Sequence, residues 1–444
     1  MSATTVADIR ATGLVIDDAG RERLVAARIG TFLLLVCLAI VYSGGERYFY
    51  LISRTLEYGF DLLMIACIVL VVSTSRIRMV AVLDALPYLG FVVAYTVWGL
   101  VVSPVQWLVA SSAVSAALLN VLLFAGIFVG VLDRRRLATF AYLIQLAVLV
   151  NVALVLWEAV DNTLTRSLAN FAHTAYYVLE RPGGLWVQPN DAAIALLFGA
   201  LLSFWARGPR AVIWLARAGS AVAIFLTASR TGMYPLILCA GIFGAMKVIT
   251  SRWDGRLWMA AVGLGGAAMI VGGALLVFLE GEAIGLWIST NYDLTRFLDL
   301  GQSLRVPSDP SRTAAAQIWF AKALDGPWGG SGIYSFQGSL SLEGAHDMYI
   351  MVWGETGVLS LIAYLGVLIA GVLQALSGAI PSRDRVGVLT LWAVYLIVGL
   401  TTHTQFSSVV GIIVIALLYR LPGVLRDRHF QARIEETLEQ SRFA

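Results

Sequence analysis

Glu343-Gly344-Ala345-His346-Asp347-Met348-Tyr349-Ile350, running on to Gly357, marks the sharpest change of character in the chain. The stretch closes the longest hydrophilic segment of the protein, roughly residues 280–345, and it opens a long apolar run. A histidine at such a border lies between a wide loop and a hydrophobic helix. It can therefore contact both an aqueous substrate and a lipid-linked one.

The composition decides the class of protein. Hydrophobic residues make up 59% of the 444 positions and charged residues only 13%, whereas soluble domains carry about 25% charged residues. Too few charges are left to solvate a globular surface, so we expect an integral membrane protein. The formal net charge of +3 implies no nucleic-acid partner. The three cysteines, Cys37, Cys67 and Cys239, lie inside apolar runs and are expected to be core residues.

Apolar runs long enough to span a bilayer recur along the chain. A spanning helix needs about 20 mostly apolar residues, and we predict an all-α polytopic protein with about 12 such helices. The runs are 27–42, 57–74, 80–102, 107–131, 138–160, 190–206, 211–228, 232–249, 257–279, 347–373, 386–402 and 405–421. Because the first run is short and the boundary at 228–232 is tight, eleven helices is the alternative count.

The distribution of lysine and arginine predicts the orientation. With the N-terminus in the cytoplasm, the short inner loops hold most of the cations, as in the run Asp133–Arg136. This places both termini inside and both long loops outside. The predicted divisions are a cytoplasmic tail 1–26, helices one to five in 27–160, a first outer loop 161–189, helices six to nine in 190–279, a large outer loop 280–346, helices ten to twelve in 347–421, and a basic cytoplasmic tail 422–444.

The large loop between helices nine and ten is expected to be partly helical. Residues 311–324 contain Trp319 and Phe320, which suit an interfacial helix at headgroup depth. The helix is expected to stop at the Gly- and Pro-containing run 325–332. A loop of this length is either functional or disordered, and its aromatic content argues against disorder.

Three arginines fall on the predicted outer side, where the charge rule disfavours them. Arg181, Arg230 and Arg312 come from distant parts of the chain. Each one alone could simply anchor a helix by reaching toward headgroups. Together with a histidine on the same side they favour an anion site, because the guanidinium fork matches phosphate oxygens. We therefore interpret them as candidate ligands of a pyrophosphate.

His346 is the candidate base of the site. Its ordinary pKa of about 6.5 leaves it mostly neutral at pH 7 and able to accept a proton, although a histidine at a helix start can also be purely structural. Asp347 could orient a partner or cap the helix, and Tyr349 and Glu355 could be packing or supporting residues. No paired-aspartate, P-loop or zinc-protease motif is present, so metal chelation of a sugar diphosphate, nucleotide hydrolysis and zinc proteolysis have no sequence support.

These residues resemble a known signature. His346-Asp347-Met348-Tyr349-Ile350, followed by six residues and Gly357, is similar to the H-[NSQ]-x-x-L-x6-G pattern of the O-antigen ligase and Wzy-type O-antigen polymerase superfamily, with Asp347 and Ile350 as departures. The remaining matches lie within residues 180–360: Arg181-Pro182-Gly183-Gly184 with Pro189-Asn190, Ser229-Arg230-Thr231-Gly232, and Arg312 with Trp319, Pro327 and Gly330-Ser331-Gly332.

The resemblance implies a metal-independent, inverting glycosyltransferase of the bacterial inner membrane, acting at the periplasmic face. Its donor would be a glycan on undecaprenyl pyrophosphate. Arg181, Arg230 and Arg312 would hold the pyrophosphate, and His346 would take the proton from the acceptor hydroxyl. Asp347, Tyr349, Glu355 and Asn190 are the candidates for supporting roles around the site.

The acceptor separates two versions of this function. A ligase transfers the glycan to a lipid A-core sugar, whereas a polymerase transfers it to another lipid-linked repeat unit of O-antigen or exopolysaccharide. The presence of a single large loop with the histidine favours the ligase. A transporter or flippase of lipid-linked glycans is the alternative from another class. It would be expected to place ionisable groups at mid-depth, whereas this sequence concentrates them at one face.

Overall fold

The computed structural model describes most of the chain. The described residues are 18–74, 79–104, 106–161, 182–227, isolated positions between 229 and 241, 310–336, 338–339, 342–343, 347–376, 380–402 and 408–442. Within them the structure is helical, apart from one antiparallel pair of two-residue strands, β1 (Gly338–Ser339) and β2 (Leu342–Glu343). The expected all-α class is thus confirmed for this part of the protein.

Thirteen labelled α-helices and one short 3-10 helix are described. Their bounds are α2 (Asp18–Tyr42), α3 (Glu46–Ile52), α4 (Arg54–Thr74), α5 (Met79–Val101), α6 (Gln106–Gly130), α7 (Arg134–Val160), η2 (Gly184–Trp186), α9 (Pro189–Leu202), α10 (Arg210–Leu226), α16 (Pro310–Asp325), α17 (Met348–Thr356), α18 (Val358–Leu376), α19 (Ser382–Gly399) and α20 (Val409–Arg442).

Five of the described helices are long and apolar enough to cross a membrane, which supports a membrane protein. They contribute the segments Val25–Tyr42, Arg54–Thr74, Val109–Gly130, Arg134–Val160 and Val358–Leu376. The predicted total of about 12 spans stays a prediction. One predicted span, 257–279, lies outside the described residues, and only scattered positions of 232–249 are described.

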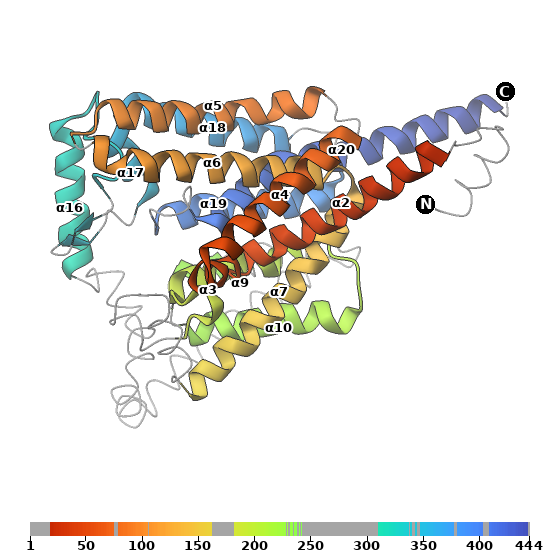
Figure 1. Cartoon of the computed structure of the whole chain (residues 1–444), viewed down its shortest axis with the longest axis horizontal. Helices are drawn as coiled ribbons and strands as arrows, with labels where there is room; N and C mark the ends of the chain where they lie inside the picture. Colours follow the sequence, from red (N-terminus) through yellow and green to blue (C-terminus); the bar gives the residue numbers. More distant parts are fainter. Residues whose placement is uncertain are drawn as a thin grey trace, which may run out of the picture.

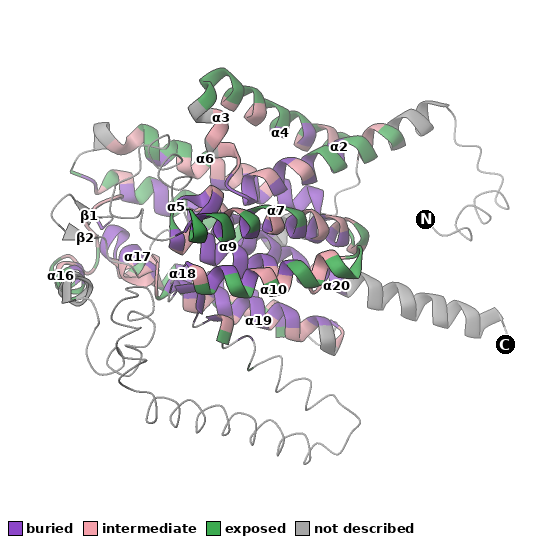
Figure 2. Cartoon of the chain, turned by 90° about the horizontal axis from the view of Figure 1, so that it is seen from below, coloured by how far each residue is buried: buried purple, intermediate pink, exposed green. Residues whose placement is uncertain are grey.

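The core forms where α5, α6 and α20 meet, and aromatic rings fill it. Tyr88 of α5 stacks on Phe124 of α6 with ring centroids 4.9 Å apart, and Phe124 lies 6.4 Å from Tyr419 of α20. Pairs of this kind contribute about 0.5–1.5 kcal/mol beyond their area burial. Figure 2 shows buried residues concentrated in the interior of the bundle and exposed residues along α3 and α4. Many of those exposed side chains are apolar, as expected for a surface that faces lipid.

The predicted helix 347–373 is wrong in one respect, because the structure divides it into α17 and α18. The break falls at Gly357, whose φ of 86° favours glycine. A Cβ at this position would lie 2.0 Å from the carbonyl oxygen of Trp328. In addition, the N–H of Val358 donates to the carbonyl of Pro327 at 2.8 Å. The helix therefore ends where the chain around Pro327 packs against it.

The helices α5, α6 and α18 lie side by side, so this part of the bundle has two distinct ends (Figure 1). One end, called the α16 end below, contains α16, the last turn of α5 and the last turn of α17, which meet at the loop after α16. There α16 lies across the ends of α5, α6 and α17, as Figure 1 shows. The predicted interfacial helix 311–324 is therefore confirmed as a helix, although its position in a membrane stays a prediction.

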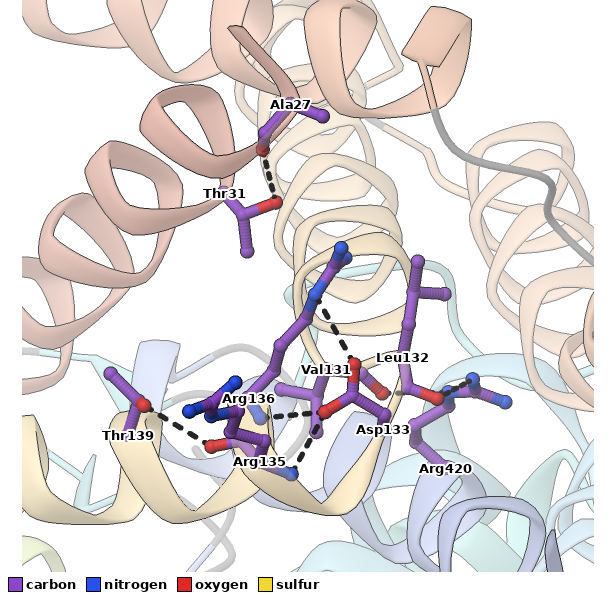
Figure 3. A network of polar contacts seen from close by, with 9 residues as sticks. All are labelled: Ala27, Thr31, Val131, Leu132, Asp133, Arg135, Arg136, Thr139 and Arg420. Carbon is purple, nitrogen blue, oxygen red and sulfur yellow. Dashed lines mark hydrogen bonds and ion pairs between the residues drawn. The ribbon is translucent and has the colours of Figure 1, made fainter. Parts of the chain in front are cut away.

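The opposite end is held by arginines that satisfy backbone carbonyls (Figure 3). Arg420 of α20 donates from Nε to the carbonyl of Val131 at 2.9 Å and from Nη2 to that of Leu132 at 3.0 Å. The next residue, Asp133, caps α7 by accepting from the N–H groups of Arg135 and Arg136. Arg134 forms an ion pair with Asp384 at the start of α19, with an N–O distance of 2.7 Å. These cations thus join α7, α19 and α20.

Candidate functional site at the α16 end of the bundle

Half of the predicted site residues have described side chains. His346, Arg181 and Arg230 lie outside the described residues, and Arg312 lies on α16 without a described side chain. Asp347, Tyr349, Glu355 and Asn190 are fully described. The site can therefore be built from these four residues and from the segments next to the other four in the sequence.

Asp347 is the N-cap of α17. Its Oδ1 atom accepts hydrogen bonds from the N–H groups of Tyr349 at 2.8 Å and Ile350 at 2.9 Å, and its backbone is extended. Such a cap satisfies donors that have no partner within the helix. Burial raises the pKa of the Asp347 carboxyl, and the two backbone donors oppose that shift. Of the two roles expected for Asp347, the structure shows the cap, directly after His346 in the chain.

Replacing this cap gives a first testable outcome. Asp347→Ala is expected to destabilise the protein by about 1 kcal/mol, since the loss of a capping oxygen typically costs about 0.5–2 kcal/mol. Asp347→Asn is the matched control, because its amide oxygen can accept the same bonds without the charge. Thermal unfolding of the detergent-solubilised protein measures both. If Asp347→Asn loses as much stability as Asp347→Ala, the charge rather than the cap is what stabilises α17.

Tyr349 joins α17 to α19. Its hydroxyl donates to the carbonyl of Leu396 at 3.0 Å, and its ring centroid lies 6.0 Å from that of Tyr364 in α18. This side chain is half-buried among helices. The structure therefore assigns Tyr349 to packing between α17, α18 and α19.

Glu355, near the C-terminal end of α17, is a fully buried carboxyl group with 0% exposure. The Tyr95 hydroxyl of α5 donates to its Oε2 atom, and the N–H of Phe336 donates to its Oε1 atom at 3.4 Å. α17 is not one of the candidate membrane spans. Burial raises the pKa of Glu355 to about 7, against the opposing effects of the Tyr95 and backbone donors and of Lys322. A carboxyl in this position changes charge near neutral pH.

The glycine-rich segment 329–332 runs between α5 and α17. The N–H of Gly332 donates to the carbonyl of Glu355 at 2.9 Å, and the N–H of Ile333 donates to that of Gly99 at 2.9 Å. Gly330 and Gly332 have φ values of 77° and 93°. A Cβ at Gly332 would meet backbone atoms of Ser103. Glycine is thus required where the loop passes between two helix ends.

The helix α16 is fixed to this loop by Lys322. Its Nζ atom donates to the carbonyl of Ser335 at 3.0 Å and lies 4.9 Å from the ring centroids of both Trp319 and Phe336. Contacts of this kind contribute about 0.5–2 kcal/mol. Arg312 is ten residues earlier on α16, about 15 Å along the helix axis at 1.5 Å per residue.

Two further segments meet at the start of α9. The Ser229 hydroxyl, next to Arg230 in the chain, donates to Oδ1 of Asn190 at 2.9 Å. The N–H groups of Gly183 and Gly184, shortly after Arg181, both donate to Oε2 of Glu158 at 2.8 Å. Asn190 thus holds the segment that carries Arg230, and Glu158 holds the segment that follows Arg181.

The helix α19 bridges the two groups of segments. It accepts the Tyr349 hydroxyl bond from α17, and its Tyr395 lies 6.5 Å, between ring centroids, from Phe198 of α9. The structure therefore links both groups of segments to α19: α17, directly after His346, and α9, whose start holds the segments next to Arg181 and Arg230. It does not place the four side chains themselves.

Several residues that hold these segments are not distinguished in the sequence. Glu158 is one of several acids near predicted helix ends, and Tyr95 and Phe336 are ordinary aromatic residues of their segments. Their partners lie far away in the chain, so no local pattern singles them out. Lys322 offers a weak signal, because it is a cation that closely follows Trp319 and Phe320 in the predicted interfacial helix.

The comparisons with protein-family models and with curated proteins find no match for this chain. Among the residues that the structure describes, no group of three or more His, Cys, Asp or Glu side chains could hold a metal ion.

Proposed function

We propose that this chain is a membrane glycosyltransferase that moves a glycan from undecaprenyl pyrophosphate to an acceptor sugar hydroxyl. The observation that supports it best is that α19 contacts both groups of motif-bearing segments, through α17 and through α9. Residues 182–190, Ser229, α16 and α17 lie far apart in the sequence, and they flank or carry Arg181, Arg230, Arg312 and His346. The Oε2 atom of Glu158 accepts from the N–H groups of Gly183 and Gly184 and so fixes the segment that follows Arg181.

The proposed chemistry is a single inverting displacement. The acceptor oxygen attacks the anomeric carbon of the donor sugar, and the bond from that carbon to the phosphate oxygen breaks. The bonding electrons leave with the pyrophosphate, whose charge Arg181, Arg230 and Arg312 would stabilise. His346 would receive the proton of the acceptor hydroxyl. The pyrophosphate is a good leaving group, so the mechanism uses no metal and no cofactor.

The described start of α17 is compatible with the signature that this proposal uses. Asp347 stands where Asn, Ser or Gln is usual, and here it caps the helix. Asn and Ser are strong N-cap residues as well. The departure from the pattern therefore preserves the helix start directly after His346.

In the cell, the proposal places the chain in the bacterial inner membrane with both termini in the cytoplasm and the α16 end facing the periplasm. The donor, the acceptor lipid and the bilayer lipids are then its partners. Ligation of O-antigen to lipid A-core is the first candidate reaction, because one large loop carries the histidine. Polymerisation of lipid-linked repeat units uses the same site chemistry and differs only in the acceptor.

Reconstitution with defined substrates tests the proposal. The full-length protein in vesicles receives an undecaprenyl-pyrophosphate glycan, either with a lipid A-core acceptor or without one. A glycan-bearing core that forms only with the acceptor identifies a ligase, and chain extension without it identifies a polymerase. Substrate that crosses the bilayer unchanged, with no new glycosidic bond in either arm, would overturn glycosyl transfer in favour of transport.

A further inference from the structure

The carboxyl group of Glu355 is the meeting point of three elements at the α16 end. It accepts a hydrogen bond from α5 through Tyr95 and one from the loop through the Phe336 N–H. The cation of Lys322 approaches it from α16. A buried carboxyl group without such donors would cost several kcal/mol. Each donor therefore holds its own element against α17.

The surroundings of Glu355 leave its charge state adjustable. The titratable groups that face it are Tyr95 from α5, Tyr334 from the loop and Lys322 from α16. Beside the carboxyl lies a cavity of about 30 Å³, to which α6 contributes the Asn120 amide. This volume suffices for about one water molecule. A water molecule in this cavity would give the carboxyl group a partner for proton exchange.

The length of α17 connects this carboxyl to the start of the helix. α17 has only nine residues, and Gly357 separates it from α18. Asp347 and Glu355 are eight residues apart, or about 12 Å along the axis. Because the hydrogen-bonded helix runs without a break from the Asp347 cap to Glu355, the contacts of Glu355 help to set the position of Asp347.

We propose that Glu355 is a positioning residue of the transfer site, which in its ionised form locks α17 onto α5 and onto the loop 326–336. This inference rests on the proposed function, because His346 directly precedes the cap of α17. The ionised carboxylate accepts from both of its donors and attracts Lys322. The protonated carboxyl must use one oxygen as a donor and attracts no cation, so it holds the two elements less firmly.

The pKa shift gives the expected pH dependence. Because burial raises the pKa of Glu355 from 4.5 to about 7, the folded protein binds this proton more tightly than the unfolded chain. The resulting stabilisation is complete below about pH 4.5 and is lost as the pH rises through about 7. Ionisation of Glu355 therefore lowers the free energy of unfolding, while it strengthens the attachment of α17 to α5 and to the loop. Glutamine is neutral at every pH. The variant Glu355→Gln therefore avoids the loss of stability on ionisation, but it also lacks the charged carboxylate that holds α17 to α5 and to the loop.

The variant Glu355→Gln separates positioning from a purely structural role. We expect kcat for glycan transfer to fall about tenfold at about pH 8, with KM for the donor unchanged, because small misplacements of reacting groups are costly. At about pH 6 the two proteins are expected to differ less than about twofold, since the wild-type carboxyl is then mostly protonated. The melting temperature of the variant at about pH 8 is expected to equal or exceed that of the wild type.

Two tyrosines of α5 provide a matched pair. Tyr95→Phe removes the hydroxyl that donates to Glu355 and is expected to lower kcat at about pH 8 by about threefold. Tyr88→Phe removes an equally buried hydroxyl that donates to Asn120 at 3.0 Å, and it is expected to leave kcat within about twofold. If Glu355→Gln keeps the wild-type kcat at about pH 8, or if kcat and melting temperature fall together, the positioning role is overturned.

A second readout keeps the two proposals distinguishable. Hydrogen exchange of residues 326–336 and 347–356 in the full-length protein needs no substrate. Faster exchange in Glu355→Gln than in Tyr88→Phe at about pH 8 supports the lock, even if the wild-type protein transfers no glycan and the proposed function fails. Equal exchange in the two variants would contradict the proposed attachment of α17 through Glu355, whatever the activity of the wild-type protein is.

Discussion

His346→Ala is expected to reduce glycan transfer by at least about 100-fold, because a positioned general base contributes about 10²–10⁴-fold. The residue directly before the cap of α17 is the proposed acceptor of the proton from the attacking hydroxyl. Without it, the hydroxyl must lose its proton to water during the attack on the anomeric carbon. Single-turnover transfer in vesicles with the wild-type and variant proteins measures the loss.

A second histidine supplies the control for this loss. His403 follows the predicted eleventh helix on the same predicted side of the membrane, and His403→Ala is expected to keep transfer within about twofold. Thermal unfolding checks that both variants are folded. Wild-type transfer by His346→Ala would show that this histidine is structural. Comparable losses in both variants would indicate a general effect of removing imidazole groups at this end.

The helical part of the fold is largely predictable from hydropathy, because each span must satisfy its own backbone in lipid. The predicted run 138–160 covers all of α7 except its first turn. The predicted interfacial segment 311–324 matches α16 within one residue at each end. The break at Gly357 is not predictable in this way. It depends on the approach of Pro327 and Trp328, and only the folded chain shows that approach.

The sequence predicts which residue types form the candidate site, but it does not predict their tertiary contacts. A histidine and an acid at the border of loop and helix indicate a site, and the sequence supplies both in His346 and Asp347. The environment of Glu355 comes from Tyr95, which is 260 positions away, and no local pattern predicts that contact. Sequence reasoning could name Glu355 as packing or supporting, and only the tertiary partners show that its carboxyl joins α5 to the loop.

Gly332→Ala is expected to destabilise the protein by about 3 kcal/mol or more, or to prevent its folding. The φ of 93° at Gly332 is disfavoured for a residue with a Cβ, and such strain costs about 1–3 kcal/mol. The added Cβ would also lie 2.3 Å from Cα and 2.9 Å from N of Ser103. These are backbone atoms directly after the end of α5, so they cannot move aside without disturbing the end of the helix and the bond from Ile333 to Gly99.

Gly329, three residues earlier in the same loop, is the matched control. A Cβ there would meet no atom within 4 Å. Gly329→Ala is therefore expected to change stability by less than about 0.5 kcal/mol, as is usual for surface substitutions. Thermal unfolding in detergent compares the two variants. If Gly332→Ala melts together with Gly329→Ala, the loop does not run tightly between α5 and α17. The connection from Glu355 to α5 would then depend on Tyr95 alone, and the loop could not transmit the charge state of Glu355 to the start of α17.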